Sequence, residues 1–368
     1  MKIALLGFGT VGSHFYKLCE GRSDLQITAV LSRRPRPELT CTVTADYDEI
    51  VRDPSIDIVV EVMGGIEPAY SYLCAAMRAG KHVVTANKQL MCARFDALTA
   101  LSKEMGVALR CTAAAGGGIP WLTSLSRASQ LDEITAVEGI LNGTTNYMLS
   151  AMTNSGADYA AALQKAQELG YAEADPTADV EGLDARRKLV LSADLAFGVN
   201  IKEEDIPCVG ISSVTAADIA GAKEEGLTYK LIARAEKSGN AVAAFVCPTL
   251  FPSSAPEAHT DGTGNLATLY AARFGRQSFS GAGAGGYPTG SSVLRDCLDI
   301  ADGCRSFYAD FFVPRSVNLS GKQGKWLFRC MGEYFTRECS AREAFDAYES
   351  YRKDDPHALL ARYAAEEE

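Results

Sequence analysis

The chain has 368 residues, enough for about two domains that each bury a core of their own. Its hydrophobic fraction of 47% and charged fraction of 22% are typical of a globular protein, and no stretch is apolar for the length of a membrane helix. A net charge of -10 disfavours nucleic acid and anionic membranes as main partners, because both attract basic surfaces. Eleven cysteines without a C-x-x-C pair indicate free thiols. We therefore expect a cytoplasmic protein.

The first predicted elements are a strand, a glycine turn and a helix. Residues 2–6 form an apolar run, and the G-x-G-x-x-G turn at residues 7–12 follows it directly, ahead of a helical pattern. Such a turn lets the backbone approach a pyrophosphate, which the amides of the helix N-terminus attract. A turn that serves only packing is the alternative, but its place after the first strand favours a dinucleotide site. The candidate cofactor residues in it are Gly7, Gly9, Thr10, Val11 and Gly12.

The second predicted strand, residues 25–31, ends in Ser32, Arg33 and Arg34. An NAD-specific site usually carries an acidic residue there for the ribose hydroxyls. Arginines suit a 2'-phosphate better, so Arg33 and Arg34 indicate NADP as the preferred cofactor, with NAD as the other possibility. The competing interpretation is a solvated basic loop.

Further apolar strands are predicted at residues 56–62 and 81–85, with a helix over residues 70–79 between them. Strands that alternate with helices predict a parallel, doubly wound sheet. We therefore expect an α/β fold with a Rossmann-type dinucleotide-binding domain over residues 1–133, completed by about residues 287–310.

The composition of the chain changes after residue 113, where a run of small residues leads into a predicted helix. The later predicted strands lie at residues 134–141, 242–247 and 277–279, and helices are predicted before residue 152, over residues 183–197 and over residues 291–301. This mixture predicts an α+β catalytic and dimerisation domain over residues 134–286, followed by a short C-terminal extension, residues 311–368.

Five acidic residues lie between residues 173 and 184, just ahead of Lys188. A helix that starts near Val180 would place Asp184 and Lys188 at i and i+4 on one face. A carboxylate and an ammonium held together in this way can move a proton. The alternative is an ordinary exposed ion pair, worth only about 0.3–0.5 kcal/mol.

Seven blocks of sequence, in this order, resemble those of homoserine dehydrogenases. They are GFGTVG at residues 7–12, VTANK at 84–88, GGGIP at 116–120, GILNGTTNY at 139–147, LGYAEADP at 169–176, GLD at 182–184 with Lys188, and GAGG at 283–286 with Pro288 and Thr289. The resemblance covers residues 1 to about 310. It implies the reversible, NAD(P)-dependent reduction of L-aspartate 4-semialdehyde to L-homoserine, on the route to threonine and methionine, by a homodimer.

The resemblance also implies roles for single residues. Lys188 would be the general acid that protonates the alkoxide, Asp184 would orient Lys188 or bind the substrate oxygen, and Lys88 would be a second cation near the nicotinamide. The substrate pocket would be formed by Glu173, which binds the α-ammonium, with Asp179, Tyr171, Gly143 and Thr144. Gly286 and Thr289 would join the cofactor site.

Two departures from the family pattern stand out. The family loop usually carries a Glu that joins backbone carbonyls around a monovalent cation, but Thr112 takes that position here. The carbonyls of Ala115, Gly117 and Ile119 would be the remaining ligands, which leaves this metal site in doubt.

The second departure is the C-terminal extension, which is too short for a complete βαββαβ regulatory ACT domain, so the resemblance is to a form without it. We predict a strand at residues 325–331, a helix that starts at a capping box of Ser340 and Glu343, and another helix after Asp355.

Two other functions are compatible with parts of the sequence. One is a semialdehyde dehydrogenase that forms a thioester on Cys111, although no histidine neighbours that cysteine in the sequence. The other is an NADP-binding sensor without catalysis, which the presence of Asp184, Lys188 and Glu173 disfavours.

Overall fold

The computed structural model describes residues 1–304, 308 and 313–364. The chain divides into two compact units, each with its own sheet. Unit 1 comprises residues 1–130 and 282–312, and unit 2 comprises residues 131–281 and 313–368. Within the described ranges, no helix combines the length and the apolar character that crossing a membrane requires.

Unit 1 is built on a six-stranded parallel sheet in the order β3-β2-β1-β4-β5-β6. This is the strand order of a dinucleotide-binding fold, so the predicted doubly wound sheet is confirmed. The strands are β1 (Lys2–Leu6), β2 (Gln26–Leu31), β3 (Thr42–Thr44), β4 (Ile58–Glu61), β5 (His82–Thr85) and β6 (Leu109–Arg110).

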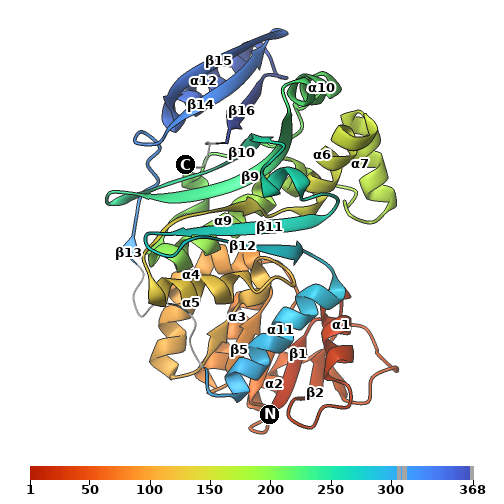
Figure 1. Ribbon diagram of the computed structural model, residues 1–368. Helices are drawn as coiled ribbons and strands as arrows, with labels where there is room; N and C mark the ends of the chain where they lie inside the picture. Colours follow the sequence, from red (N-terminus) through yellow and green to blue (C-terminus); the bar gives the residue numbers. More distant parts are fainter. Residues whose placement is uncertain (305–307, 309–312, 365–368) are drawn as a thin grey trace. The chain divides into compact units, whose positions relative to one another are not determined.

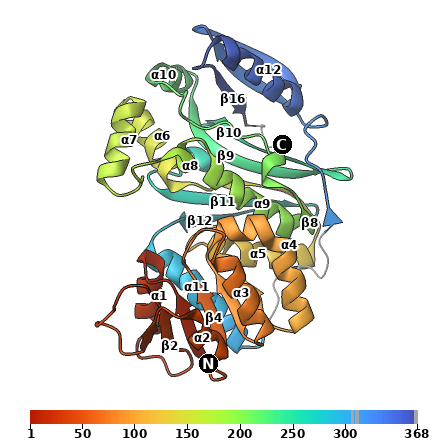
Figure 2. The same ribbon diagram turned by 180° about the vertical axis from the view of Figure 1, so that it is seen from behind.

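Helices cover both faces of this sheet. Helices α1 and α11 lie over one face (Figure 1), and α3 lies over the other (Figure 2). The helices of unit 1 are α1 (Thr10–Cys19), α2 (Tyr47–Arg52), α3 (Ala69–Arg78), α4 (Lys88–Met105), the short 3-10 turn η1 (Thr112–Ala114), α5 (Trp121–Leu131) at the boundary, and α11 (Gly286–Ala301).

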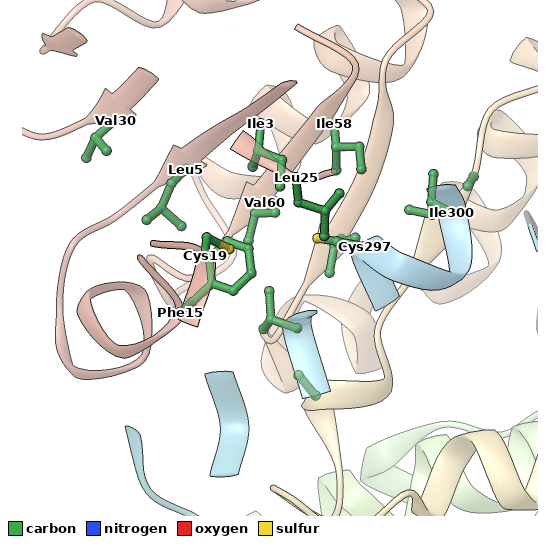
Figure 3. Close-up of a cluster of buried hydrophobic side chains, with 14 residues drawn as sticks. Ile3, Leu5, Phe15, Cys19, Leu25, Val30, Ile58, Val60, Cys297 and Ile300 are labelled. Carbon is green, nitrogen blue, oxygen red and sulfur yellow. The ribbon is translucent and has the colours of Figure 1, made fainter. Parts of the chain in front are cut away.

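The core of unit 1 joins segments that are far apart in the sequence. Leu5 of β1 and Phe15 of α1 are fully buried, and Cys297 and Ile300 of α11 pack into the same cluster (Figure 3). The chain therefore leaves unit 1 after α5 and returns with α11 to close this hydrophobic core.

Unit 2 contains an eight-stranded mixed sheet in the order β12-β11-β7-β9-β10-β16-β14-β15. The strands are β7 (Ile134–Ile140), β9 (Leu227–Ser238), β10 (Ala241–Pro252), β11 (Gly264–Ala271), β12 (Gly275–Ala282), β14 (Gln323–Cys330), β15 (Glu333–Ser340) and β16 (Leu359–Tyr363); β8 (Val199–Asn200) and β13 (Val313–Pro314) form a separate pair. Its helices are α6 (Gly143–Ser155), α7 (Tyr159–Glu168), α8 (Thr177–Val180), α9 (Leu183–Phe197), α10 (Ala216–Glu224) and α12 (Ala341–Asp354), with the 3-10 turns η2 (Glu203–Asp205) and η3 (Pro256–His259).

Residues of the expected C-terminal extension belong to unit 2. They form strands β14 and β15, helix α12 and strand β16, and these strands join the eight-stranded sheet. Strand β16 pairs with β10 on one side and with β14 on the other (Figure 1). The predicted strand at residues 325–331 is confirmed by β14, and the capping box of Ser340 and Glu343 opens α12. A complete βαββαβ unit would need one more helix than the described part of this segment provides, and one more strand in this sheet, because β13 pairs with β8 instead.

The helix predicted after Asp355 is wrong. The carboxylate of Asp355 accepts hydrogen bonds from the backbone amides of Met331 and His357, so it holds a turn. The next residues form β16, whose Leu360 is fully buried. A strand forms because pairing with two neighbouring strands satisfies its backbone polar groups inside the core.

Removing apolar volume from the core of unit 1 should lower its stability. Leu5 is 0% exposed and Leu131 is 78% exposed. We expect Leu5→Ala to cost about 2–5 kcal/mol of unfolding free energy, because it leaves a cavity. Leu131→Ala, at the exposed last residue of α5 on the boundary of unit 1, is the control and should change it by less than about 0.5 kcal/mol.

Urea denaturation followed by tryptophan fluorescence measures this effect. A Trp326→Phe background leaves Trp121, which lies in unit 1, as the single reporter. Equal losses in the two leucine variants would contradict the assigned core.

Candidate active site

Unit 1 holds a cavity of about 910 Å³ at the glycine turn. It is lined by Gly7, Phe8, Gly9, Leu31, Ser32, Arg33, Arg34, Arg36, Ala45, Val62, Met63, Gly64, Pro68 and Tyr72. The lining brings the glycine turn and the predicted arginines together, and it includes three arginines but no aspartate or glutamate. This cavity suits a polyanionic ligand.

The glycine turn is shaped by close backbone approach. Gly7 has a φ of 99°, which disfavours a side chain, and a Cβ added at Gly12 would lie 2.4 Å from the Gly7 carbonyl oxygen. A Cβ added at Gly9 would meet nothing within 4 Å, so this side of the turn is open. Thr10 and Val11 begin α1 and do not line the cavity. The turn therefore leaves room for a phosphate beside the first amides of α1, as dinucleotide binding requires.

Arg36 was missed in the sequence, although it stands two residues after Arg34. Its Nη2 donates to the Phe8 carbonyl oxygen at 3.2 Å, and its guanidinium lies 5.1 Å from the centre of the Phe8 ring. Arg36 therefore joins the basic loop after β2 to the glycine turn.

Glu61 was also missed, and it supports the opposite wall of the cavity. Its carboxylate accepts hydrogen bonds from the amides of Met63 at 2.7 Å and Gly64 at 3.2 Å, and from the Thr85 hydroxyl at 2.6 Å. Burial raises the pKa of Glu61. An acidic residue at the end of an otherwise apolar strand was the available signal.

Lys88 is the half-buried first residue of α4. The preceding residue, Asn87, accepts from the Leu90 amide as the helix cap and donates to the Gly65 carbonyl oxygen at 2.6 Å. This cap ties the start of α4 to the loop beside the cavity and so fixes the position of Lys88 within unit 1.

In unit 2, the predicted pair of Asp184 and Lys188 is present and buried. The Lys188 ammonium lies 2.7 Å from Asp184 Oδ2 and donates to the Leu141 carbonyl oxygen at 2.6 Å. Both residues are 6% exposed, so the alternative of an ordinary surface ion pair is wrong. Charges buried to this degree are stable only when they are paired and hydrogen-bonded.

Asn142 connects this pair to a third carboxylate. Its Nδ2 donates to Asp184 Oδ2 at 2.9 Å and to Asp179 Oδ1 at 2.7 Å, while its Oδ1 accepts from the Thr145 amide at the start of α6. Burial raises the pKa of Asp179. Asn142 was not among the predicted site residues, although an Asn just ahead of a helical segment is a cap signal.

The other predicted substrate residues lie around the start of α6. The Thr144 hydroxyl donates to the Tyr171 carbonyl oxygen at 2.6 Å, and a Cβ added at Gly143 would lie 2.9 Å from the Thr263 carbonyl oxygen. The Tyr171 side chain is exposed, as is Glu173 on the loop between α7 and α8. The structure thus groups Asp179, Asp184 and Lys188, and it leaves the Glu173 carboxylate outside their hydrogen-bond network.

Gly286, one of the two predicted residues of the second glycine loop, packs against α1. A Cβ added at Gly286 would lie 2.3 Å from His14 Nδ1, and the Thr289 amide donates to the Gly285 carbonyl oxygen. Neither Gly286 nor Thr289 lines the 910 Å³ cavity.

The predicted cation ligands are only partly available. The Gly117 carbonyl oxygen accepts from Ser292 Oγ at 2.6 Å, and that of Ile119 accepts from the Trp121 amide at 2.8 Å. Thr112 is buried and adds no charge where the family usually has Glu. These carbonyl oxygens do not form the anionic cage that a cation favours, so no chemistry is assigned to a cation at this site.

The thioester alternative is wrong for Cys111. This residue is 0% exposed, and burial, with the nearby Asp296 carboxylate, raises the pKa of its thiol well above the ordinary value. A buried thiol of this kind is inert as a nucleophile.

Two family models match the chain. They are described as "Homoserine dehydrogenase", over residues 120–298, and "Homoserine dehydrogenase, NAD binding domain", over residues 7–111. The homoserine dehydrogenase of Bacillus subtilis (strain 168) is 39% identical, with 83% of this chain and 74% of the relative covered. That of Synechocystis sp. is 43% identical, with 82% and 73% covered.

Solved structures are similar over most or all of the chain. A homoserine dehydrogenase from Thiobacillus denitrificans has a TM-score of 0.88 at 28% identity, with 99% of this chain and 98% of that chain covered. A homoserine dehydrogenase from S. aureus has a TM-score of 0.76 at 33% identity, with 100% of this chain and 94% of that chain covered. A hyperthermophilic archaeal homoserine dehydrogenase in complex with NADPH has a TM-score of 0.70 at 22% identity, with 81% and 96% covered, which shows a shared fold.

Replacing Asn142 should separate its two structural roles. Asn142→Ala removes the α6 cap, worth about 0.5–2 kcal/mol, and the donor shared by Asp179 and Asp184, worth about 1–3 kcal/mol. Asn142→Ser keeps a capping oxygen but loses the shared donor, so it should cost about 1 kcal/mol less than Asn142→Ala. Urea denaturation of both variants measures the difference, and equal losses would show that the cap contributes nothing.

Proposed function

Because the chain belongs to the homoserine dehydrogenase family, we propose that it interconverts L-homoserine and L-aspartate 4-semialdehyde by NAD(P)-dependent hydride transfer. This reaction would place it on the route to threonine and methionine. The observation that carries the proposal is the buried pair of Lys188 and Asp184, which lies on α9 inside the matched family region.

Lys188 is proposed as the proton donor and acceptor. Hydride would pass between a bound nicotinamide dinucleotide and the substrate carbon that is an alcohol in homoserine and an aldehyde in the semialdehyde. Negative charge develops on the substrate oxygen, and an ammonium group beside that oxygen stabilises the charge and supplies the proton. Asp184, 2.7 Å from the Lys188 ammonium, orients it and favours its charged form.

The carboxylates near Lys188 are proposed to bind the substrate's α-ammonium. Asp179 is held 2.7 Å from Asn142, and burial keeps its pKa raised, so a cation placed beside it would relieve an unfavourable negative charge. Glu173, Tyr171, Gly143 and Thr144 complete the pocket on the strength of the family resemblance.

NADP is proposed as the preferred cofactor. Its 2'-phosphate would meet Arg33 and Arg34, and the lining of the 910 Å³ cavity contains no carboxylate to repel it. Thr10, Val11 and Gly12 would present the start of α1 to the pyrophosphate. Four further points stay predictions. Lys88 would lie near the nicotinamide, and Gly286 and Thr289 would contribute to the cofactor site. The protein would assemble as a homodimer and be located in the cytoplasm.

The proposed role of Lys188 can be tested by substitution. Lys188→Ala should lower kcat for homoserine oxidation about 10²–10⁴-fold, the usual contribution of a positioned acid or base, with NADPH affinity unchanged. Lys165→Ala, a change to a lysine with a 58% exposed side chain, is the control and should keep full activity.

Removing Lys188 alone leaves Asp184 buried without this partner, so folding must be checked. The double variant Asp184→Asn with Lys188→Met removes both charges and should fold but remain inactive. A folded Lys188→Ala protein with near-normal turnover would refute the role. Wild-type protein that binds NADPH but oxidises no homoserine would instead support the non-catalytic sensor.

Arg33 and Arg34 should determine which dinucleotide the protein prefers. Replacing both Arg33 and Arg34 with Ala should weaken NADP binding by about 1.5–3 kcal/mol and leave NAD binding nearly unchanged. Arg52→Ala, a change to a surface arginine of α2 with a 76% exposed side chain, is the control. Titrations with both dinucleotides measure the effect, and equal losses for NAD and NADP would mean that the pair only shapes the loop.

A further inference from the structure

Unit 2 contains a second cavity, of about 560 Å³, on the other face of its sheet from α9. Arg234 of β9 is paired in register with Phe245 of β10, and the next residue, Val246, points to the opposite face, where it lies beside Gly182 at the start of α9. The cavity is lined by Glu138, Arg234, Phe251, Pro252, Ser254, Ala255, Pro256, Glu257, Tyr270, Arg276, Arg362 and Ala364. It is therefore separate from the network of Asp184 and Lys188.

The carboxylates that line this cavity are already engaged by arginines. Glu138 is paired with Arg234 and accepts from the Tyr270 hydroxyl at 2.5 Å. Glu257 lies 2.6 Å from Arg276. Three arginines and two carboxylates thus line the cavity, which leaves an excess of positive charge.

Arg362 of β16 carries the unbalanced charge. It is 4% exposed, and its Nε is buried without a hydrogen-bond partner. Among the residues that the structure describes, no carboxylate forms an ion pair with it; its guanidinium lies 5.8 Å from the centre of the Phe245 ring. Burial, and repulsion from Arg234, lower the pKa of Arg362 despite the attraction of Glu138 and Glu236, which are themselves paired with Arg234. A buried cation that no carboxylate pairs with is destabilised, and a bound anion would offset that cost.

We propose that this cavity binds a small organic carboxylate, whose oxygens pair with the Arg362 guanidinium. A planar guanidinium matches the two oxygens of a carboxylate. The carbon chain would lie against the apolar part of the lining, which Phe251, Pro252 and Pro256 provide. The volume falls within the range of about 300–1,000 Å³ that is usual for small-molecule sites.

Butyrate is a suitable probe, with butyramide as its uncharged analogue and sodium chloride at equal ionic strength as the salt control. Butyrate should raise the Tm of the full chain saturably, while butyramide and chloride should not. Arg362→Met should weaken butyrate binding at least about tenfold, the loss expected for a charged hydrogen bond. Arg337→Met, a change to an exposed arginine of β15 in the same sheet, should bind butyrate like the wild type.

The stability of Arg362→Met without butyrate is a second readout. Because the substitution removes a buried charge that lacks a counter-ion, its Tm should equal or exceed that of the wild type. A lower Tm would mean that Arg362 is neutralised within the protein or its assembly, and the proposal would be wrong. Wild-type protein with no butyrate response beyond that of chloride, or unchanged butyrate affinity in Arg362→Met, would also overturn it.

Discussion

The burial of the Lys188 ammonium is the constraint on which the candidate site of unit 2 depends. A cation removed from water needs acceptors close to it. Asp184 supplies one from one turn away on α9, and the carbonyl oxygen of Leu141, the residue after β7, supplies the other. Asp184 is buried in turn and accepts a hydrogen bond from Asn142 Nδ2. Each partner thus fixes another element, so the sheet, α6 and α9 are held in one arrangement around a single charge.

Both units use an asparagine in the same way. Asn87 follows β5 and Asn142 follows β7, and each caps the helix that comes next with its carbonyl oxygen. The amide nitrogen then holds a second group, which is the Gly65 carbonyl oxygen in unit 1 and a pair of aspartates in unit 2. One side chain therefore sets where a helix begins and also where the adjacent polar groups lie.

The sequence was most informative where neighbouring residues determine the structure. The glycine turn, the short apolar strands of unit 1 and the i,i+4 pair on α9 were all predictable for this reason. Strand β9 was not predicted, because its charged residues interrupt the apolar pattern; Arg234 is neutralised by Glu138, which is distant in the sequence. The shared donor of Asn142 and the turn at Asp355 likewise depend on partners that spacing alone cannot reveal.

The return of α11 to unit 1 has a consequence for synthesis on the ribosome. Roughly 150 residues separate the two segments of this unit, and their translation takes about 8–30 s at ordinary elongation rates. Throughout that interval Leu5 and Phe15 lack the side chains of Cys297 and Ile300 that complete their cluster. The nascent chain therefore exposes an unfinished apolar surface, on which a ribosome-associated chaperone would have time to act.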